Sequence, residues 1–235
     1  MSPLRQGATG LALAAAMILA WAALQVLGAR LHGEAMAAAA ILLVPSLCWL
    51  DVGLFIVAHD AMHGSLAPGR PWLNRLVGGL ALGLYAGFSF DRLLPKHLAH
   101  HGAPGTRADP DFHAPDPAAF AAWYLAFFRQ YFGLRELIVL ASFAMLYLLL
   151  VGPLANLLLF WALPALLASL QLFLFGTWLP HRHLGGGFAD RHRARSNEMG
   201  RLASLLTCFH FGYHLEHHRA PDVPWWRLPG ERRLS

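Results

Sequence analysis

Four stretches of the chain are apolar and long enough to cross a lipid bilayer: approximately residues 9–29, 36–58, 134–151 and 154–179. A spanning helix needs about 20 mostly apolar residues, because each adds about 1.5 Å and the hydrocarbon core is about 30 Å thick. Short connectors at 30–34 and 152–153 join these stretches in pairs. The first stretch could be a signal peptide, but the second follows at once and favours a hairpin. The sequence therefore predicts an all-α integral membrane fold with four transmembrane helices.

The composition supports this prediction. Hydrophobic residues make up 57% of the 235 and charged residues 13%, whereas soluble domains are about 45–50% apolar and about 25% charged. The formal charge of +5 does not indicate nucleic-acid binding, because Arg and Lys mostly flank the apolar stretches instead of forming a basic helix. Cys48 and Cys208 lie in no CxxC motif and are expected to be packing residues. Without an internal repeat, residues 1–235 are predicted to form a single domain.

Segment 76–94 is glycine-rich, apolar and almost long enough to cross. If it crossed, the histidines at 97–101 would lie on the opposite side of the membrane from those at 59–63. If it dips in and returns, or lies at the interface, all histidine clusters share one side. The second reading also puts these basic residues on that side: Arg70, Arg75, Arg92, Lys96, Arg107, Arg129, Arg182 and the run 191–201. The positive-inside rule makes that side cytoplasmic, with both termini, as expected in a bacterial inner membrane.

Three other segments complete the organisation. Segment 119–131 contains Trp and Tyr among apolar residues and is predicted to be an interfacial helix. Residues 102–118 are rich in Gly and Pro and predict a loop, as do the polar residues 184–196. These segments connect the helices on the cytoplasmic side.

Histidine is abundant, with 14 in the chain, and most fall in tight clusters. Within each cluster the later histidines lie three or four residues after the first, so on a helix their imidazoles share a face, and His181 stands alone at the end of the fourth apolar stretch. Imidazole suits iron, copper, nickel or zinc, and one tetrahedral site needs only four ligands, so nine imidazoles predict two metal ions in a cytoplasmic cap. The spacing does not choose the metal. The nine predicted ligands are His59, His63, His97, His100, His101, His181, His214, His217 and His218.

Neighbouring polar residues are candidates to support these ligands. Asp60, Asp111 and Glu216 adjoin the clusters and could accept the outer N–H of a ligating imidazole, which fixes its orientation. An ordinary ion pair with a nearby Arg is an equally good reading of each carboxylate. The remaining histidines divide by position: His113 and His210 could support the ligands or bind metal, His183 is undecided, and His32 and His192 are expected to be solvated.

The clusters and their surroundings also resemble a known family. The blocks are AHDAMHG (58–64), LLPKHLAHHGAPGTRADPDFH (93–113), FGTWLPHR (175–182) and FHFGYHLEHHRAPDVPWWRLP (209–229). They resemble the membrane-bound fatty-acid desaturase and hydroxylase superfamily and, within it, the bacterial β-carotene 4-ketolases. The resemblance runs from about residue 45 to 229, and no cluster histidine is missing.

The resemblance implies a definite chemistry. It implies two non-haem Fe²⁺ ions, O₂ as co-substrate, and electrons from an external donor such as ferredoxin or another reductase. The implied substrate is a carotenoid from the bilayer, hydroxylated twice at C4 of its β-ionone ring and then dehydrated to a ketone, from β-carotene to echinenone and canthaxanthin. Segments 76–94 and 119–131 and the pair Trp225–Trp226 are candidates to line an apolar route, although the tryptophans could equally anchor the chain at the lipid interface.

Other functions remain open at the level of sequence. A fatty-acyl desaturase or a carotenoid hydroxylase of the same superfamily has comparable histidine spacing. A bis-imidazole membrane haem protein would need histidines within the crossing helices, whereas these lie at or beyond the helix ends. A metal transporter would need a row of ionisable groups inside the spans, which the apolar stretches lack.

Overall fold

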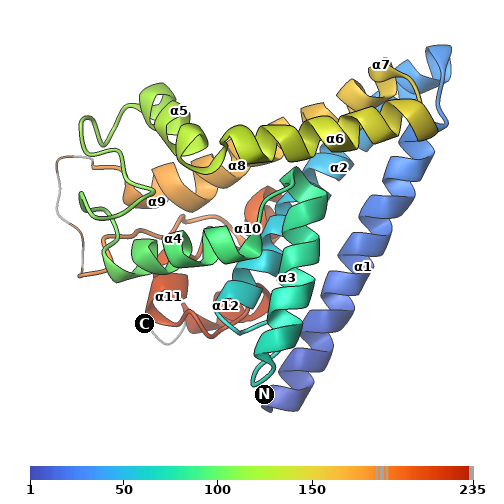
Figure 1. Cartoon of the computed structure of the whole chain (residues 1–235). Helices are drawn as coiled ribbons and strands as arrows, with labels where there is room; N and C mark the ends of the chain where they lie inside the picture. The colour runs from blue at the N-terminus through green and yellow to red at the C-terminus, as the bar shows by residue number, and fades with distance from the viewer. Residues whose placement is uncertain (184, 186–187, 189, 233–235) are drawn as a thin grey trace.

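The computed structural model describes residues 1–183, 185, 188 and 190–232, which form helices and loops without a strand (Figure 1). The predicted all-α class is confirmed. Two long helices, α1 (Pro3–Ala29) and α2 (Gly33–Met62), form an N-terminal hairpin. The second hairpin consists of α6 (Leu134–Leu150) and a long helix whose parts are α7 (Leu154–Leu157), α8 (Leu163–Phe173) and α9 (Leu179–His181).

Within the described part of the chain, three helices are long and apolar enough to cross a bilayer: α1, α2 and the helix Leu154–His181. A fourth results if α5 (Phe120–Tyr131) and α6 count as one span, although a bend of 78° separates them. By itself α6 has 17 residues and is about 26 Å long, which is close to the hydrocarbon thickness. The predicted helical membrane fold is confirmed, with α5 as a separate helix that precedes α6.

The two hairpin connectors meet at one end of the molecule. Buried Asn156 of α7 donates its side-chain amide to the carbonyls of Gly28 (2.7 Å) and Leu31 (2.8 Å) at the turn between α1 and α2. These bonds add a side-chain donor to backbone carbonyls at the turn that follows α1, where the regular helical hydrogen bonds end. In Figure 1 the connectors lie at the upper right, and α4, α9 and α11 lie at the left. The fold therefore has a connector end and an opposite end that carries the histidines.

Segment 76–94 is divided between two helices and does not form one continuous helix. Helix α3 (Pro71–Ala86) packs against α2, and α4 (Phe90–Gly102) follows after a turn. Gly87 makes the turn with φ of 67°, a left-handed conformation that glycine adopts without strain. Its carbonyl accepts a hydrogen bond from Arg135 at the start of α6. Because α4 turns back toward α2, the histidines of both helices meet, as the non-crossing prediction requires.

The helix Leu154–His181 contains two π-helical segments, Leu158–Ala162 and Leu174–Trp178. Each precedes a proline closely: Pro164 follows the first and Pro180 the second. A proline lacks the N–H that would close the regular ladder, and a π segment rotates the following residues around the axis. The second segment therefore helps to set the direction of His181 at the end of the helix.

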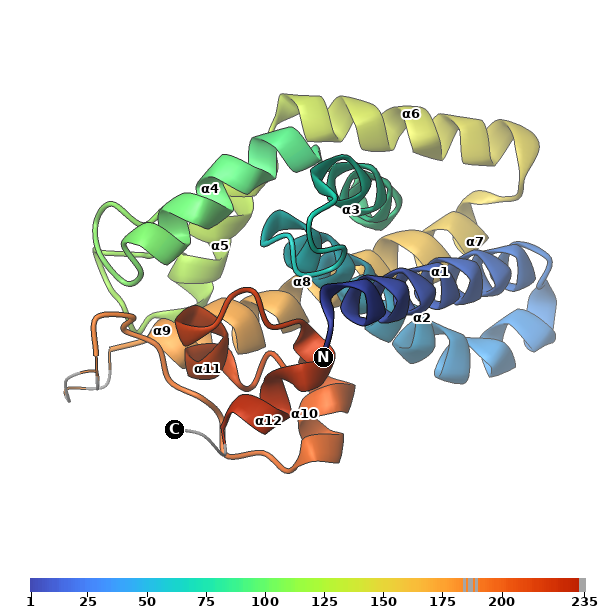
Figure 2. The same cartoon turned by 90° about the horizontal axis from the view of Figure 1, so that it is seen from below.

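The C-terminal part closes the histidine end. It contains α10 (Arg201–Cys208), α11 (His214–Arg219), a short turn Trp225–Arg227 and α12 (Leu228–Glu231), which Figure 2 shows beside the N-terminus of α1. Phe209 has φ of 45° and is buried, with its ring stacked 4.4 Å from that of Trp49 on α2. This packing holds a backbone conformation that is costly for a side chain with a Cβ, and it aims α11 at the site.

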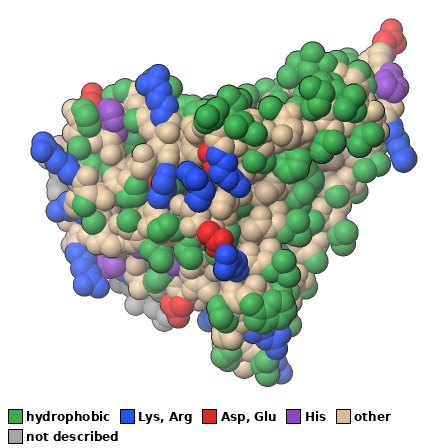
Figure 3. Space-filling view, viewed as in Figure 1, with side chains coloured by type: hydrophobic (Ala, Val, Ile, Leu, Met, Phe, Trp, Pro, Cys, Tyr) green, Lys and Arg blue, Asp and Glu red, His purple; other side chains and the backbone are tan. Residues whose placement is uncertain are grey.

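The surface agrees with a membrane environment. Hydrophobic side chains gather over α6 in Figure 3, while many Lys and Arg side chains lie toward the left of the same view. Leu149, Leu150 and Leu154, at the connector end, are each more than half exposed. Exposed leucines on this scale would be costly in water and are favourable in lipid.

Candidate metal centre

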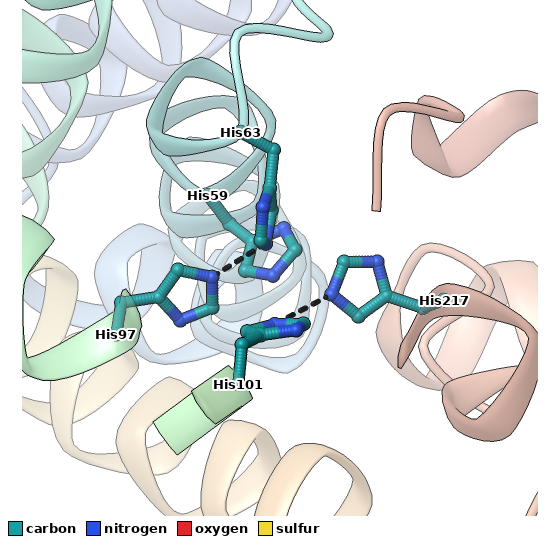
Figure 4. A group of neighbouring side chains, drawn as sticks. All are labelled: His59, His63, His97, His101 and His217. Carbon is teal, nitrogen blue, oxygen red and sulfur yellow. Dashed lines mark hydrogen bonds between the residues drawn. The ribbon is translucent and has the colours of Figure 1, made fainter. Parts of the chain in front are cut away.

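Five of the predicted ligands form one group, the five-histidine set, whose nitrogen atoms lie within 4.8 Å of one another. Figure 4 shows the imidazoles pointing toward a common centre. The closest approaches are 2.6 Å between the Nε2 atoms of His63 and His97, and 3.1 Å between those of His101 and His217. The set comes from α2 with the residue directly after it, from α4 and from α11, and it consists of His59, His63, His97, His101 and His217.

The other four predicted ligands form the four-histidine set, which is fully buried. Its Nε2 atoms are 2.9 Å apart between His181 and His214, 3.0 Å between His214 and His218, and 3.2 Å between His218 and His100. Helices α4, α9 and α11 supply these residues. The sets are adjacent, because the rings of His101 and His218 stack with centroids 4.2 Å apart. All nine histidines thus lie in two neighbouring groups.

Both sets fit a metal ion. Two nitrogens bound at a right angle to one ion, each about 2.1 Å from it, would be about 3.0 Å apart, close to the measured separations. Both ring nitrogens of His59, in the five-histidine set, are buried without a hydrogen-bond partner. A buried nitrogen with no partner is costly, and a bound metal would satisfy one nitrogen of this ring. An all-imidazole donor set suits iron, copper, nickel or zinc.

Burial keeps most of these imidazoles in the neutral form that binds metals. It lowers the pKa of His63 to about 4, assisted by the charge of His100, and it lowers the pKa of His101 to about 2. The pKa of His217 also lies well below its usual value, through burial and the neighbouring histidines. A neutral ring has a free lone pair, whereas a protonated ring cannot bind a cation.

His100 behaves differently because carboxylates adjoin it. Its Nδ1 lies 3.0 Å from Asp109 and 3.8 Å from Asp111. Burial opposes the charged form, but the hydrogen bond to Asp109 and the charges of both aspartates outweigh it and raise the pKa of His100. With Nδ1–H donated to Asp109, the Nε2 atom is left to face the four-histidine set. Such a partner fixes the ring and makes the nitrogen a stronger ligand.

Two further contacts orient the site. His181 Nδ1 lies 2.8 Å from the carbonyl oxygen of Arg193, which fixes its ring with Nε2 toward His214. The hydroxyl of Tyr131, at the end of α5, donates a hydrogen bond to Asp111 Oδ1. Burial raises the pKa of Asp111 to about 6, although the nearby His100 charge lowers it. Both contacts come from loops or helix ends that sequence spacing could not place beside the histidines.

A long apolar cavity of about 430 Å³ opens beside the five-histidine set. Histidines 59, 97 and 217 line its inner end, and Leu157 and Trp161 line its outer end near the connectors. Residues 85, 86 and 88 and residues 124, 127, 128 and 131 also line it, from the two segments predicted to do so. The tryptophans of the C-terminal segment do not: Trp225 packs edge-on against Phe209, and Trp226 lies near Gly10 of α1.

The family described as Fatty acid desaturase matches residues 34–143 and 128–234, so the match includes both histidine sets. The chain belongs to this family. The superfamily resemblance drawn from the motifs is therefore confirmed. The apolar helices of this chain indicate a membrane protein.

Individual relatives are similar over the whole chain. A beta-carotene ketolase from Paracoccus sp. strain PC1 is 50% identical, with 100% of this chain and 99% of the relative covered. A second, from Paracoccus sp. strain N81106 / MBIC 01143, is 51% identical over 96% and 93%. A zeaxanthin 4-ketolase from Chlamydomonas reinhardtii is 39% identical over 99% of this chain, which spans 55% of that relative.

The three predicted carboxylates have different surroundings. Asp111 faces His100, as described. Asp60 Oδ1 is 3.6 Å from His59 Nδ1, and its Oδ2 accepts a hydrogen bond from the backbone N–H of Trp225 (3.1 Å), so it fastens the C-terminal segment to α2. Glu216 accepts a hydrogen bond from Ser196, whose hydroxyl also accepts from the Leu215 N–H at 3.1 Å. Glu216 therefore anchors the loop before α10 to α11.

The other histidines lie outside both sets. His210 has φ of 67° and packs near Tyr213 and Trp225, so it belongs to the turn that aims α11. His183 is exposed between Phe112 and Phe188, His113 is half-buried, and His32 is exposed in the connector. His192 is half-buried instead of solvated as expected, with its ring centroid 6.2 Å from that of His218.

Asp109 is the functional residue that sequence reasoning missed. Its carboxylate accepts hydrogen bonds from the backbone N–H of Gly105 and of Asp111, both at 2.8 Å, and so is held in place to meet His100. The available signal was the Asp-Pro-Asp sequence at 109–111, where a proline-restricted turn directs two carboxylates toward one place. Spacing from the histidine cluster alone did not distinguish the first aspartate from the second.

Proposed function

We propose that this chain is a β-carotene 4-ketolase, which converts the C4 methylene of a β-ionone ring to a ketone. The supporting observation is the position of nine convergent imidazoles at the end of a long apolar cavity within a membrane fold. Two relatives that are about half identical to this chain over nearly its whole length carry the name beta-carotene ketolase. Acyl desaturation and carotenoid 3-hydroxylation are the rival activities within the same family.

The nine histidines are proposed to hold two Fe²⁺ ions, one in each set. When bound, the iron ions supply the activation of O₂ that breaking an allylic C–H bond requires, with electrons from ferredoxin or another reductase. The role of the protein is then to hold the ligands and to place the substrate. His100 and His181 are fixed by Asp109 and by the Arg193 carbonyl, which keeps their Nε2 atoms directed inward.

The residues at the inner end of the cavity would orient the reacting ring. Phe211 packs between the cavity and the histidines, with its ring stacked 5.5 Å from His217 and edge-on to His59 at 4.6 Å. Thr177 and Gly176 of the second π segment also line the cavity, and Gly176 lies directly beside the Phe211 ring. An apolar ring held among these groups excludes water from the reacting carbon and fixes which methylene faces the histidines.

The apolar wall also favours the final step. Two hydroxylations at C4 give a geminal diol, and loss of one water molecule gives the ketone. A diol has two hydroxyls that need hydrogen-bond partners, while the lining of the cavity is mostly hydrocarbon. Because an unpaired hydroxyl is costly in such surroundings, the equilibrium shifts toward the ketone and free water.

The proposed location is the bacterial inner membrane, with both termini and the histidine end in the cytoplasm. This orientation rests on the distribution of Lys and Arg along the sequence. It gives a soluble electron donor access to the histidine end while the substrate arrives through lipid. An exposed basic side chain near that end, Arg107 in the loop after α4, suits an acidic donor.

The test is pigment analysis of β-carotene-producing cells that express the chain. The expected products are red 4-keto carotenoids, with the 4-hydroxy compound appearing first. Cells that express His214→Ala provide the matched control and should keep their β-carotene. Pigment hydroxylated only at C3 would indicate a hydroxylase, altered acyl chains would indicate a desaturase, and a Soret band in the purified protein would indicate haem.

A further inference from the structure

A second cavity, of about 500 Å³, lies between α1, α3 and α6 toward the connector end. We call it the distal groove. Its walls include Trp21 of α1, Gly79 and Gly83 of α3, Phe143 and Tyr147 of α6, and Trp161 of the first π segment. Gln25, a polar residue at its edge, already donates its amide to the carbonyl of Phe160 (3.1 Å). The groove is therefore mainly aromatic and aliphatic.

Trp161 lines both cavities, so the distal groove adjoins the histidine cavity at this side chain. Trp161 lies 20 residues before His181 in the same long helix, which corresponds to about 30 Å at 1.5 Å per residue. An extended carotenoid with a ring at each end is roughly 30 Å long, comparable with the hydrocarbon core of a bilayer. When one ring lies at the histidines, the opposite ring reaches Trp161.

We propose that the distal groove is the binding subsite for the non-reacting end ring of the carotenoid. This inference rests on the proposed ketolase function and deepens it. The aromatic faces of Trp21, Phe143 and Trp161 suit a methylated ring, and the absence of side chains at Gly79 and Gly83 leaves room for it. The shared lining residue Trp161 and the match of lengths favour this occupant over an acyl chain of the bilayer.

Such a subsite acts as a specificity determinant. Binding one ring at a fixed distance from the histidines limits how far the opposite ring can slide, and so it selects C4 as the carbon that reacts. A substrate with two rings must turn end for end before its second ring is oxidised, and the ketone-bearing ring then occupies the distal groove. A shorter substrate with a single ring uses the histidine cavity without this anchor.

Gly83→Leu is the sharpest test, because it adds a side chain to the groove at a position where a Cβ has room. A Cβ at Gly83 meets no atom within 4 Å, and one at Gly79 meets only Phe90 Cβ at 3.8 Å. Replacing a helical glycine also removes a helix-weakening residue. Gly79→Leu is the second variant. Gly230→Leu is the matched control, since it adds the same side chain to open space in α12, outside the lining of both cavities.

The assay compares two substrates in membranes that contain wild type or variant, supplied with iron, O₂ and a ferredoxin system. One is β-carotene, and the other is an apocarotenal that keeps one β-ring and about half of the polyene. We expect Gly83→Leu and Gly79→Leu to lower kcat/KM for β-carotene by about ten-fold or more, as added methylenes in a pocket do. Ketone formation from the apocarotenal should match wild type, and Gly230→Leu should match wild type with both substrates.

The remaining outcomes overturn the inference in distinguishable ways. Equal losses with both substrates would mean that the leucine disturbs the histidine site and that the groove holds no end ring. Unchanged kcat/KM with both substrates would mean that bilayer lipid occupies the groove. Wild type that makes no ketone from either substrate would overturn the proposed function and, with it, this subsite.

Discussion

His100 Nδ1 lies 3.0 Å from both carboxylate oxygens of Asp109, which is itself buried. Two backbone N–H groups hold the carboxylate, so it has little freedom to turn away. The pair links the loop after α4 to the four-histidine set. A carboxylate in this position orients the imidazole and raises its basicity toward a metal without touching the metal itself.

Asp109→Asn is therefore expected to weaken iron binding and lower ketone formation by about 10–100-fold, the usual cost of losing such a partner. Metal analysis of purified protein should show that iron is lost mainly from one site. Asp116→Asn is the matched control, because this exposed aspartate only caps nearby backbone N–H groups. Full iron content and activity in Asp109→Asn would remove the assigned positioning role.

The two-set arrangement makes a separate prediction for individual ligands. His63→Ala and His181→Ala, one from each set, should each abolish the ketone and leave about one iron ion per chain instead of two. His32→Ala should keep full activity and iron, since this side chain is exposed at the connector end. If His63→Ala retained both iron ions, the five-histidine set would not be a metal site.

Acid should lower the stability of the metal-free protein, and the direction of this effect follows from the lowered pKa of His63. Burial, then the His100 charge, lowers the pKa of His63 from 6.5 to about 4. As pH falls through 6.5, the unfolded chain takes up a proton at this position and the folded chain does not, so unfolding becomes more favourable until about pH 4. The pKa of His101 is lowered to about 2, with the same sign.

Thermal melts in detergent after chelation should therefore show a melting temperature that falls from pH 7 toward pH 4. His63→Ala should flatten this dependence, because it removes one group that titrates differently in the two states, whereas His32→Ala should leave it unchanged. A melting temperature that stays constant over this range would show that these imidazoles do not differ in protonation between folded and unfolded protein.

Much of this fold could be predicted because periodicity and apolar length are local properties. Residues four apart share a helix face whatever the tertiary structure, so the pairing of His59 with His63 could be read from spacing. The paired connectors and the separate helix α5 followed from the same reasoning. The resemblance of the long blocks to one superfamily supplied the chemistry that spacing could not choose.

Other features depend on contacts that spacing does not encode. The break at Gly87 results from a left-handed turn and a bond to Arg135, which divide an apolar run into α3 and α4. Asp109 meets His100 through the fold of a proline-containing loop. The division of nine histidines into sets of five and four also depends on α11, where His217 and His218 are adjacent in sequence but belong to different sets.

The proposed topology gives a further prediction. Reporters that distinguish cytoplasm from outside, fused after Arg107 and near Gly33, should report opposite sides, with Arg107 in the cytoplasm. Arg107 lies in the loop after α4 at the histidine end, whereas Gly33 begins α2 at the connector end. An outside signal at Arg107 together with an inside signal at Gly33 would reverse the orientation and place the electron donor on the other side.

The identity of the metal is the last prediction, and it separates binding from catalysis. An all-imidazole set binds Zn²⁺ more tightly than Fe²⁺ by the general order of affinities, so overexpressed protein is expected to carry some zinc. Zinc has no redox chemistry, and ketone formation should therefore increase with iron content and not with total metal. Chelation followed by reloading with Fe²⁺ should restore activity, whereas reloading with Zn²⁺ should restore the thermal stability of the metal-bound state without activity. Gly230→Leu, which leaves both histidine sets intact, should respond to each metal as wild type does. Turnover by zinc-loaded protein that contains no iron would show that the proposed iron chemistry is wrong, even if both histidine sets bind metal.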